Sequence, residues 1–409
     1  MDGASLKKKI LDSIWLRVKD YFYDQRVTDS PIVQNLNARA SNSQKKAIIC
    51  YLPYSFFNNW EETTCGRTQP FEILAIVDAL SKLDYRIDLI DCNDLRALQH
   101  VESKRYDLIF GFGETFYHLT QQQPWAMSVL YMTEQHPEFS YREEQKRVDY
   151  YNQRHQTKLQ SSRSGKFYQR HHLEPKYTCV IVMGEEDQFS GTYDAPYAIF
   201  PTGLLHPNFI LQPKNQEIAR KNFLWLGSPG AAIHKGLDLL TEVIANRRDL
   251  TLHIGGISDA EREMLKIGKI KNVIDHEYID VQSQLFKDLV STCAYIILPS
   301  CSEACATSVT TGMLHGLIPV VMKDAGFNRL GSLPVFLEHY ALEYLDKELS
   351  ELADKSPEQL ELYSQRVYRY AHQHFTIDSF ANQIETILRD IVNKYDKNTT
   401  PANTPAFVR

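Results

Sequence analysis

Several patterns that define specialised classes of protein are missing from this chain. Its seven cysteines are scattered between Cys50 and Cys305 without a C-x-x-C pair, so we expect neither a disulfide framework nor a zinc site of closely spaced cysteines, and a reducing cytosol fits best. No apolar run approaches the roughly 18 residues of a membrane-spanning helix. The formal net charge of −6 argues against an extended nucleic-acid-binding surface. We therefore expect a cytoplasmic protein without a nucleic-acid partner.

Motifs that hold common cofactors are missing as well. The strand-to-helix turns contain no G-x-G-x-x-G, no G-x-x-x-x-G-K-[ST], no G-x-S-x-G and no D-x-D. These absences argue against a nicotinamide or flavin cofactor, P-loop chemistry, a hydrolase elbow and a metal-clamped diphosphate. His171 and His172 lie in a polar stretch with no third ligand at metal spacing, so we expect surface residues there and no bound metal.

What is present is a globular composition. The 409 residues are 43% apolar and 11% aromatic, and at about 100–200 residues per domain the length predicts two or three domains. Residues 5–25 place apolar side chains at helical spacing opposite a face of lysines and an arginine. This helix either packs on the body of the protein or rests peripherally on an anionic membrane surface. The polar residues 26–43 are expected to form a linker.

Short apolar runs alternate with helical patterns along the first half of the chain. The runs predict strands at 45–54, 85–91, 106–113, 126–133, 177–184 and 197–203, with a helix over 69–83 and a helix followed by a loop over 141–172. Near-continuous apolar strands that alternate with helices indicate a parallel sheet covered on both faces. We assign residues 44–205 to this first Rossmann-like domain.

The alternation breaks over 204–222, which contains two prolines, and then restarts. Strands at 223–228, 250–256, 272–279, 294–300 and 318–322, with helices at 236–246, 282–291 and 308–315, predict a second doubly wound domain over 206–375. Residues 357–395 have a helical pattern, and the tail 396–409 is rich in Pro, Thr and Asn and is expected to be disordered. The fold class is therefore α/β, with two doubly wound Rossmann-like domains.

Two strand-to-helix turns in the second domain are suited to bind an anion. Lys235 opens a helix after a loop of small residues, where its ammonium group can meet a phosphate oxygen or remain a solvated surface charge. In the second turn, the small residues Cys305, Ala306 and Thr307 lead into a helix. The free N–H groups at the start of this helix can bind a phosphate. Glu303 beside this turn either grips sugar hydroxyls or caps the helix.

Together, the segments FLWLGS…HKGLDLL (223–240) and SEACATSVTTGMLHGLIPVV (302–321) resemble the C-terminal half of retaining nucleotide-sugar glycosyltransferases of the GT-B fold, and most of all family 4 of these enzymes. The resemblance is close over 223–330 and looser over 45–205. It implies two domains that face each other across a cleft, with the C-terminal helix 376–395 returning to the first domain. The implied reaction moves a sugar from a nucleotide-diphosphate donor to a hydroxyl acceptor (a glycan, a lipid-linked molecule or a protein), with retention and without metal or cofactor.

The resemblance implies roles for residues of the second domain. Lys235 would bind the donor diphosphate, and Ser228 stands in the loop where family members usually carry an arginine. Glu303 corresponds to the first glutamate of the family's E-x7-E motif and would contact the donor sugar. At the position of the second glutamate, which grips the ribose, this chain has Thr311. The further donor-binding residues that the match implies are Cys305, Ala306, Thr307 and, beside the base, His276 and Tyr278.

In the first domain, Gly66 and Arg67 lie where the family has its glycine-rich, phosphate-facing loop. Arg67 would supply the missing positive charge, or else be a surface residue. His136 follows a predicted strand where the family often places a histidine near the donor sugar, with Glu134 as a rival on the acceptor side. The implied catalytic set is His136, Lys235 and Glu303.

Thr311 in place of a glutamate keeps two alternatives open. A catalytically degenerate GT-B protein would bind a nucleotide sugar or a partner without turnover, and an epimerase on the same fold would release an altered sugar nucleotide without any acceptor. The presence of both Lys235 and Glu303 favours the transferase. We expect it to act in glycan or polysaccharide biosynthesis in the cytoplasm, peripherally at the membrane if its acceptor is lipid-linked.

Overall fold

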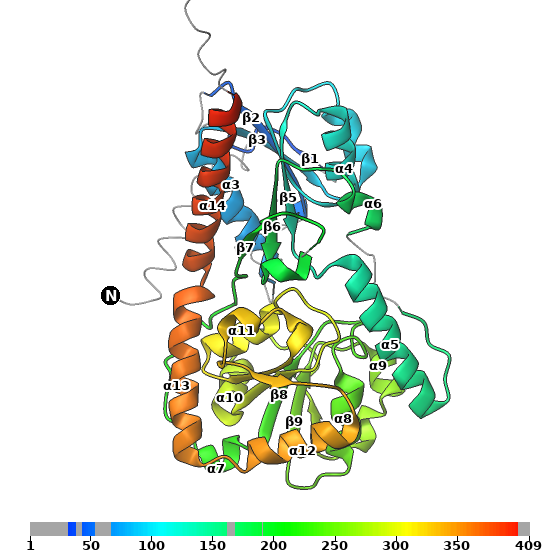
Figure 1. Cartoon of the computed structure of the whole chain (residues 1–409). Coiled ribbons are helices and arrows are strands. Elements are labelled where there is room, and N and C mark those ends of the chain that lie inside the picture. Colours follow the sequence, from blue (N-terminus) through cyan, green and yellow to red (C-terminus); the bar gives the residue numbers. More distant parts are fainter. Residues whose placement is uncertain (1–31, 38–42, 54–66, 162–167, 190, 400–409) are drawn as a thin grey trace, which may run out of the picture.

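The computed structural model describes residues 32–37, 43–53, 67–161, 168–189 and 191–399. The helix predicted over 5–25 and most of the tail 396–409 lie outside the described residues, as does most of the linker 26–43. Within the described part, no helix is long and apolar enough to cross a membrane. The chain forms two α/β domains, one above the other in Figure 1.

The first domain is built on a seven-stranded sheet in the order β1-β3-β2-β4-β5-β6-β7. The strands are β1 (Ile32–Val33), β2 (Lys46–Tyr51), β3 (Arg86–Asp91), β4 (Leu108–Gly111), β5 (Met127–Met132), β6 (Cys179–Met183) and β7 (Tyr197–Ile199). Strands β2 to β7 are parallel to one another. The central strands β4 and β5 are buried along their whole length, because helices cover both faces of a parallel sheet.

Strand β1 corrects one sequence-based interpretation. Ile32 and Val33, which the polar composition of 26–43 assigns to a linker, form an edge strand antiparallel to β3, and both side chains are buried. Just beyond, the amide side chain of Asn37 donates to the carbonyl oxygen of Tyr85 and accepts from the N–H of Ile87. Two apolar residues are too few to show a period among polar neighbours, so the pattern does not indicate this strand.

The second domain has a six-stranded sheet in the order β10-β9-β8-β11-β12-β13, parallel throughout. Its strands are β8 (Asn222–Leu226), β9 (Thr251–Gly255), β10 (Val273–Asp275), β11 (Tyr295–Leu298), β12 (Ile318–Met322) and β13 (Val335–Leu337). The prediction of two doubly wound domains is thereby confirmed. The edge strand β13 was not predicted.

Helices cover both sheets. They are α3 (Gln69–Lys82), α4 (Gly113–Gln122), α5 (Pro137–His155), α6 (Arg170–Leu173), α7 (Gln216–Ala219), α8 (Leu237–Ala245), α9 (Asp259–Met264), α10 (Gln284–Thr292), α11 (Thr307–Leu314), α12 (Leu342–Ala353), α13 (Pro357–His374) and α14 (Ile377–Thr399). Short 3-10 helices are η2 (Leu95–His100), η3 (Glu186–Phe189), η4 (Ile267–Lys269), η5 (Lys323–Ala325) and η6 (Asn328–Leu330).

Two helices link the domains. Helix α13 lies along the second domain, and α14 continues upward to pack against α3 of the first, where Lys82 Nζ lies 2.8 Å from Glu385 Oε2 (Figure 1). Helix α14 ends at Thr399, so it extends beyond the boundary at 396 where disorder was predicted. The helical spacing of apolar residues ends before residue 396, so the sequence pattern does not indicate the last turn of the helix.

Helix α5 leaves the first domain after β5 and lies along the second. The guanidinium group of Arg147, which is wholly buried, donates to the carbonyl oxygen of Pro299 at 2.9 Å. Two turns further along the helix, Arg154 pairs with the buried Asp238 at 2.6 Å and with Glu242 at 2.9 Å. Burial raises the pKa of Asp238, while the charges of Arg147 and Arg154 oppose that rise. The helix therefore anchors the first domain on charged groups of the second.

Replacing Arg154 by alanine should destabilise the protein, because Asp238 would keep its buried charge and lose its hydrogen-bonded partner. Breaking a buried ion pair costs roughly 3–5 kcal/mol, and we expect a loss near the lower end because Arg147 remains nearby. Thermal unfolding measures the effect. Arg96→Ala, which removes an exposed arginine paired with Asp94, is the matched control and should leave the melting temperature unchanged. An equally small change for Arg154→Ala would contradict the anchor.

Candidate active site

A cleft of about 620 Å³ lies between the two domains. Its lining includes residues that follow strands of both sheets, among them Phe112, Thr133, Gly227, Gly256 and Ser302. Parallel sheets place ligands beyond the carboxyl ends of their strands, and here both sheets direct those ends toward one cavity. The predicted cleft between the domains is therefore present.

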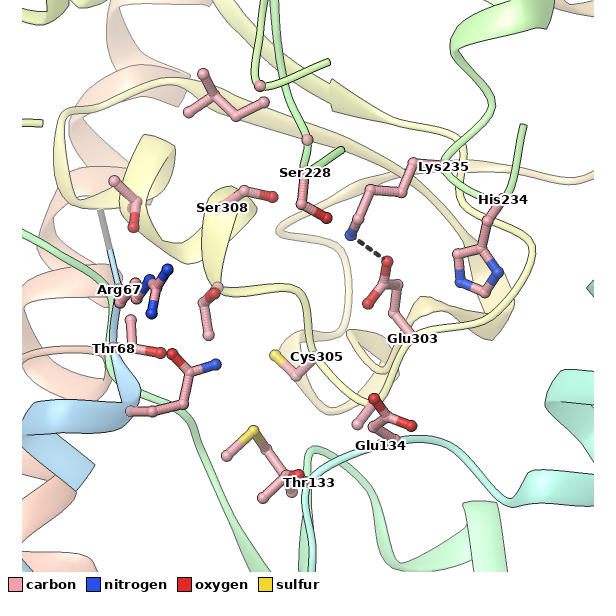
Figure 2. A pocket seen from close by; sticks show the side chains of 18 of the residues that line it. Arg67, Thr68, Thr133, Glu134, Ser228, His234, Lys235, Glu303, Cys305 and Ser308 are labelled. Atoms are coloured by element: carbon pink, nitrogen blue, oxygen red, sulfur yellow. Dashed lines mark hydrogen bonds and ion pairs between the residues drawn. The ribbon is translucent and has the colours of Figure 1, made fainter. Parts of the chain in front are cut away.

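Lys235 and Glu303 meet at the centre of this cleft (Figure 2). Lys235 Nζ lies 2.5 Å from Glu303 Oε1, and the side chains are only 10% and 14% exposed. The two residues come from the turns after β8 and β11, which are neighbours in the sheet. Both residues were predicted to belong to the donor site, and the structure brings them together as an ion pair.

Hydrogen bonds to buried side chains fix the backbone at Lys235 and in the loop before it. The indole N–H of Trp225 donates to the carbonyl oxygen of Lys235 at 3.1 Å. In the preceding loop, the N–H groups of Gly230 and Ala232 both donate to the carboxylate of Glu261. Burial raises the pKa of Glu261, but hydrogen bonds from Ser258 and from these two backbone groups outweigh it and hold the pKa below its usual value. The N–H groups of Gly230 and Ala232 thus bind an internal carboxylate, whereas Gly227, Ser228, His234 and Lys235 of the same loop line the cleft.

The loop that carries Glu303 is fixed by a Cys–His contact. His234 Nε2 lies 2.8 Å from the carbonyl oxygen of Ser302 and must carry the proton, so Nδ1 accepts from the Cys301 thiol at 3.4 Å. Burial raises the pKa of Cys301 to about 12, so this thiol is a neutral hydrogen-bond donor and not a nucleophile. The hydroxyl of Ser300 donates to Glu303 Oε1 at 3.0 Å, which aims the carboxylate at Lys235.

Helix α11 begins beside this pair. Its N-cap residue, Ala306, makes no side-chain cap hydrogen bond, and its first two residues, Thr307 and Ser308, line the cleft. A helix N-terminus carries partial positive charge and outward N–H groups that suit a phosphate. Cys305 also lines the cleft, whereas Ala306 does not. The helix start predicted as an anion site therefore faces the same cavity as Lys235.

Thr311 lines the cleft, but its hydroxyl has another partner. Thr311 Oγ1 accepts from the N–H of Leu204 at 3.0 Å, and one turn later His315 Nε2 accepts from the N–H of His206 at 3.0 Å. Leu204 and His206 belong to the segment that connects the domains. A glutamate here would offer two charged oxygen atoms to a ribose, whereas the single neutral hydroxyl of Thr311 already accepts one backbone hydrogen bond. No local pattern in the chain indicates this contact.

The remaining predicted residues divide into two groups. Arg67 and Tyr278 line the cleft, with Arg67 and Thr68 opposite the α11 start in Figure 2; Gly66 lies outside the described residues. His136 is not brought to the cleft: as N-cap of α5 its Nδ1 accepts from the N–H of Glu138, and its Nε2 lies 3.1 Å from Thr192 Oγ1. Its rival Glu134 does line the cleft.

His276 is likewise not among the cleft residues. It stacks on His253 with ring centroids 5.3 Å apart, and its Nε2 lies 3.0 Å from His253 Nδ1. Burial, together with the facing His276, lowers the pKa of His253 to about 4, so the pair is neutral near pH 7. The exposed Tyr278, two residues on, is the aromatic side chain of this turn that reaches the cavity.

Sequence reasoning missed a buried carboxylate on the first-domain side. Glu72, in the first turn of α3, lines the cleft and is 2% exposed. The phenol of Tyr51, at the end of β2, donates to Glu72 Oε2 at 2.9 Å. Burial raises the pKa of Glu72, while hydrogen bonds from Tyr51 and Thr68 oppose the rise. In the sequence, Glu72 reads as an ordinary helix-start glutamate, and only the fold places it against Tyr51.

The His171-His172 pair does have a third group nearby, contrary to the prediction. Glu114 Oε1 lies 3.3 Å from Nε2 of both histidines. However, His172 Nδ1 accepts from the N–H of Gln169 in a capping box, so Nε2 carries the proton and faces the Glu114 carboxylate. A metal-bound imidazole uses its ligating nitrogen as a lone pair and donates from the other. The cluster is therefore held as hydrogen bonds on the first domain, away from the cleft.

Comparisons with known proteins support the fold. No family model and no curated protein matches the chain, but solved structures do. Sucrose-phosphate synthase from Thermosynechococcus elongatus is 13% identical, with 86% of this chain and 100% of that chain covered and a TM-score of 0.60. Anabaena HepE in complex with UDP-glucose is 12% identical (84% and 99% covered, TM-score 0.55). WaaG, a glycosyltransferase involved in lipopolysaccharide biosynthesis, is 14% identical (83% and 99% covered, TM-score 0.54). The predicted GT-B fold is confirmed.

Thr311→Val should lower the melting temperature, because it keeps the shape of the side chain and removes the acceptor of the Leu204 N–H. A buried donor left without a partner costs about 1–3 kcal/mol, and we expect a loss near the lower end because this contact is half-buried. Thr311→Ser retains the acceptor and should recover most of the loss. Thermal unfolding of both variants tests the contact, and a valine variant as stable as the wild type would show that the hydroxyl does not hold the connecting segment.

Proposed function

We propose that this protein is a glycosyltransferase that moves a sugar from a nucleotide-diphosphate donor to a hydroxyl acceptor, with retention and without a metal ion. The observation that carries the proposal is the Lys235–Glu303 pair in the cleft, at 2.5 Å and next to the start of α11. One cation, one carboxylate and a helix N-terminus are the groups that a sugar diphosphate needs. The resemblance of the two motifs to family 4 enzymes supports the same assignment.

The chemistry follows from these charges. As the bond between the sugar C1 and the phosphate oxygen breaks, its electron pair passes to the diphosphate, and the sugar acquires oxocarbenium character. Lys235, the N–H groups at the start of α11 and Arg67 supply positive field to the leaving group, where preorganised charge lowers the barrier. The acceptor oxygen bonds to C1, and its proton passes to the departing phosphate oxygen. Glu134, which lines the cleft, would accept a hydrogen bond from the acceptor hydroxyl.

The ion pair itself suggests how donor binding proceeds. A buried ammonium group needs a counter-charge, and in the protein Glu303 provides it. A diphosphate beside Lys235 would take over that role and release the Glu303 carboxylate to accept hydrogen bonds from the donor sugar. HepE, which shares the fold of this chain, was solved in complex with UDP-glucose, so UDP-glucose and free UDP are the first probes to use.

A second candidate function is favoured by one observation. Thr311 uses its acceptor on the Leu204 N–H, so the ribose loses a charged acceptor, whose hydrogen bonds contribute roughly 1.5–3 kcal/mol against 0.5–1.5 for a neutral one. A protein that binds a nucleotide sugar without turnover would tolerate such a loss. Donor hydrolysis or transfer by the wild-type protein separates the transferase from this binding protein, and an altered sugar nucleotide formed without acceptor would instead indicate an epimerase.

For location and partners, the proposal rests on sequence alone. We propose that the protein works in the cytoplasm in glycan or polysaccharide biosynthesis. If the acceptor is lipid-linked, the basic amphipathic segment 5–25 would supply a peripheral membrane contact. That segment lies outside the described residues.

Lys235→Ala should reduce kcat by more than about tenfold, or roughly 1.4 kcal/mol, with every donor that the wild type uses. The reason is that the ammonium charge acts on a leaving group whose negative charge grows in the transition state. Steady-state kinetics with a panel of nucleotide sugars measures this. Lys347→Ala, which removes an exposed lysine of α12, is the control. A smaller loss than tenfold would make Lys235 a structural cation.

Glu303→Gln should reduce turnover while leaving UDP affinity nearly unchanged. The amide keeps the shape of the side chain but is a weaker acceptor for sugar hydroxyls, and UDP has no donor sugar. Calorimetric titration with UDP, alongside the kinetic assay, separates the two effects. Intact transfer by the glutamine variant would place Glu303 outside the donor-sugar site.

A further inference from the structure

The loop that carries Glu303 belongs to the second domain, but it also forms hydrogen bonds with residues of the first domain. Ser140, in the first turn of α5, has its hydroxyl oxygen 2.6 Å from that of Ser302. Gln188, in the 3-10 helix η3 after β6, directs its side-chain Nε2 at the carbonyl oxygens of Glu303 (3.3 Å) and Ala304 (3.2 Å). Both contacts cross between the domains, and together they reach the residues on each side of Glu303.

The same segment is also packed closely around the Ala304 carbonyl. Gly184, at the end of β6, has φ +89°, and a Cβ there would overlap the Ala304 oxygen. On the second-domain side, a Cβ on Gly326 would overlap the same oxygen. Only residues without a side chain allow this approach. The peptide between Ala304 and Cys305 is therefore enclosed by glycines of both domains.

Neighbouring contacts fix the segment from which Gln188 projects. The Asn328 side chain donates to Glu185 Oε2 at 2.9 Å, and Arg329 donates to the carbonyl oxygen of Gly184 at 3.0 Å. The other amide atom of Gln188, Oε1, is buried and has no hydrogen-bond partner among the described residues. The orientation of the amide is thus set by the two carbonyl oxygens that its Nε2 reaches.

We propose that Gln188 is a positioning residue of the first domain that places Glu303 for recognition of the donor sugar. This inference rests on the proposed function. Lys235 and Ser300 bind the Glu303 carboxylate, whereas Gln188 binds the backbone of the same residue. A glutamate discriminates between sugar hydroxyls only if both its side chain and its backbone are held in place. In the proposed binding mode the diphosphate is held by Lys235 and the start of α11, so nucleotide binding would not need this contact. Replacing Gln188 should therefore weaken binding of the donor sugar and leave binding of the nucleotide unchanged.

The test compares UDP-glucose with UDP by titration calorimetry on the full chain. For Gln188→Ala we expect about tenfold weaker UDP-glucose binding, equal to roughly 1.4 kcal/mol, with UDP affinity unchanged. Gln188→Met keeps the length of the side chain and lacks the donor, so it should behave like the alanine variant, which excludes a cavity as the cause. Gln365→Ala, at an exposed glutamine of α13 that bonds within its helix, should match the wild type.

A second measurement does not depend on the donor. Amide hydrogen exchange of the peptide over residues 300–307 should become faster in both Gln188 variants and stay at the wild-type rate in Gln365→Ala. Unchanged exchange, or equal loss of UDP and UDP-glucose affinity, would overturn the inference. If the wild type binds neither UDP nor any nucleotide sugar while the exchange result holds, the contact is real and the proposed function fails, and with it the role given to Gln188 in sugar recognition.

Discussion

The ion pair between Lys235 and Glu303 is the interaction on which this site depends. The two residues are 68 positions apart in the chain, and they meet because β8 and β11 lie side by side in the sheet. Each strand ends at the cleft and continues into a turn before a helix. Taking two charges out of water is costly unless each compensates the other. The pair is thus a preformed arrangement of opposite charges that lines the cleft.

Contacts between the two domains fix the position of this ion pair in the cleft. Helix α5 places Arg147 and Arg154 on the second domain, α14 returns to α3, and Thr311 and His315 hold the connecting segment. Gln188 also reaches the loop around Glu303 itself. The relative position of the two sheets is therefore set by polar contacts beside the cleft together with the apolar face of α14, which packs into the core of the first domain. Polar contacts between domains are typical where relative motion accompanies function.

Much of the fold could be predicted from the sequence, because buried parallel strands leave continuous apolar runs between helical segments. The runs at 126–133 and 318–322 correspond to β5 and β12. Short edge strands left no such signal, as β1 and β13 show. Helix α12 is different: Leu345, Leu349 and Leu352 are buried at helical spacing, a pattern that is present in the sequence and was overlooked.

The candidate site was predictable where a residue's neighbours along the chain define its role. Lys235 and Glu303 lie in recognisable turns, and both line the cleft. His136 and His276 were chosen by their place after a strand, but one caps a helix and the other stacks on a histidine. The partners of Thr311, Glu72 and Gln188 lie 107, 21 and at least 115 residues away in the chain. Such contacts depend on the folded arrangement, which local spacing does not encode.

The central claim is that the cleft binds a nucleotide-diphosphate sugar through Lys235 and Glu303. A crystal structure of the protein with a bound nucleotide sugar tests it most directly. We predict a diphosphate oxygen within hydrogen-bond distance of Lys235 Nζ, about 2.7–3.2 Å, with the sugar hydroxyls against Glu303 and the start of α11 beside the phosphates. A nucleotide sugar bound elsewhere on the protein, with the Lys235–Glu303 pair undisturbed, would contradict it.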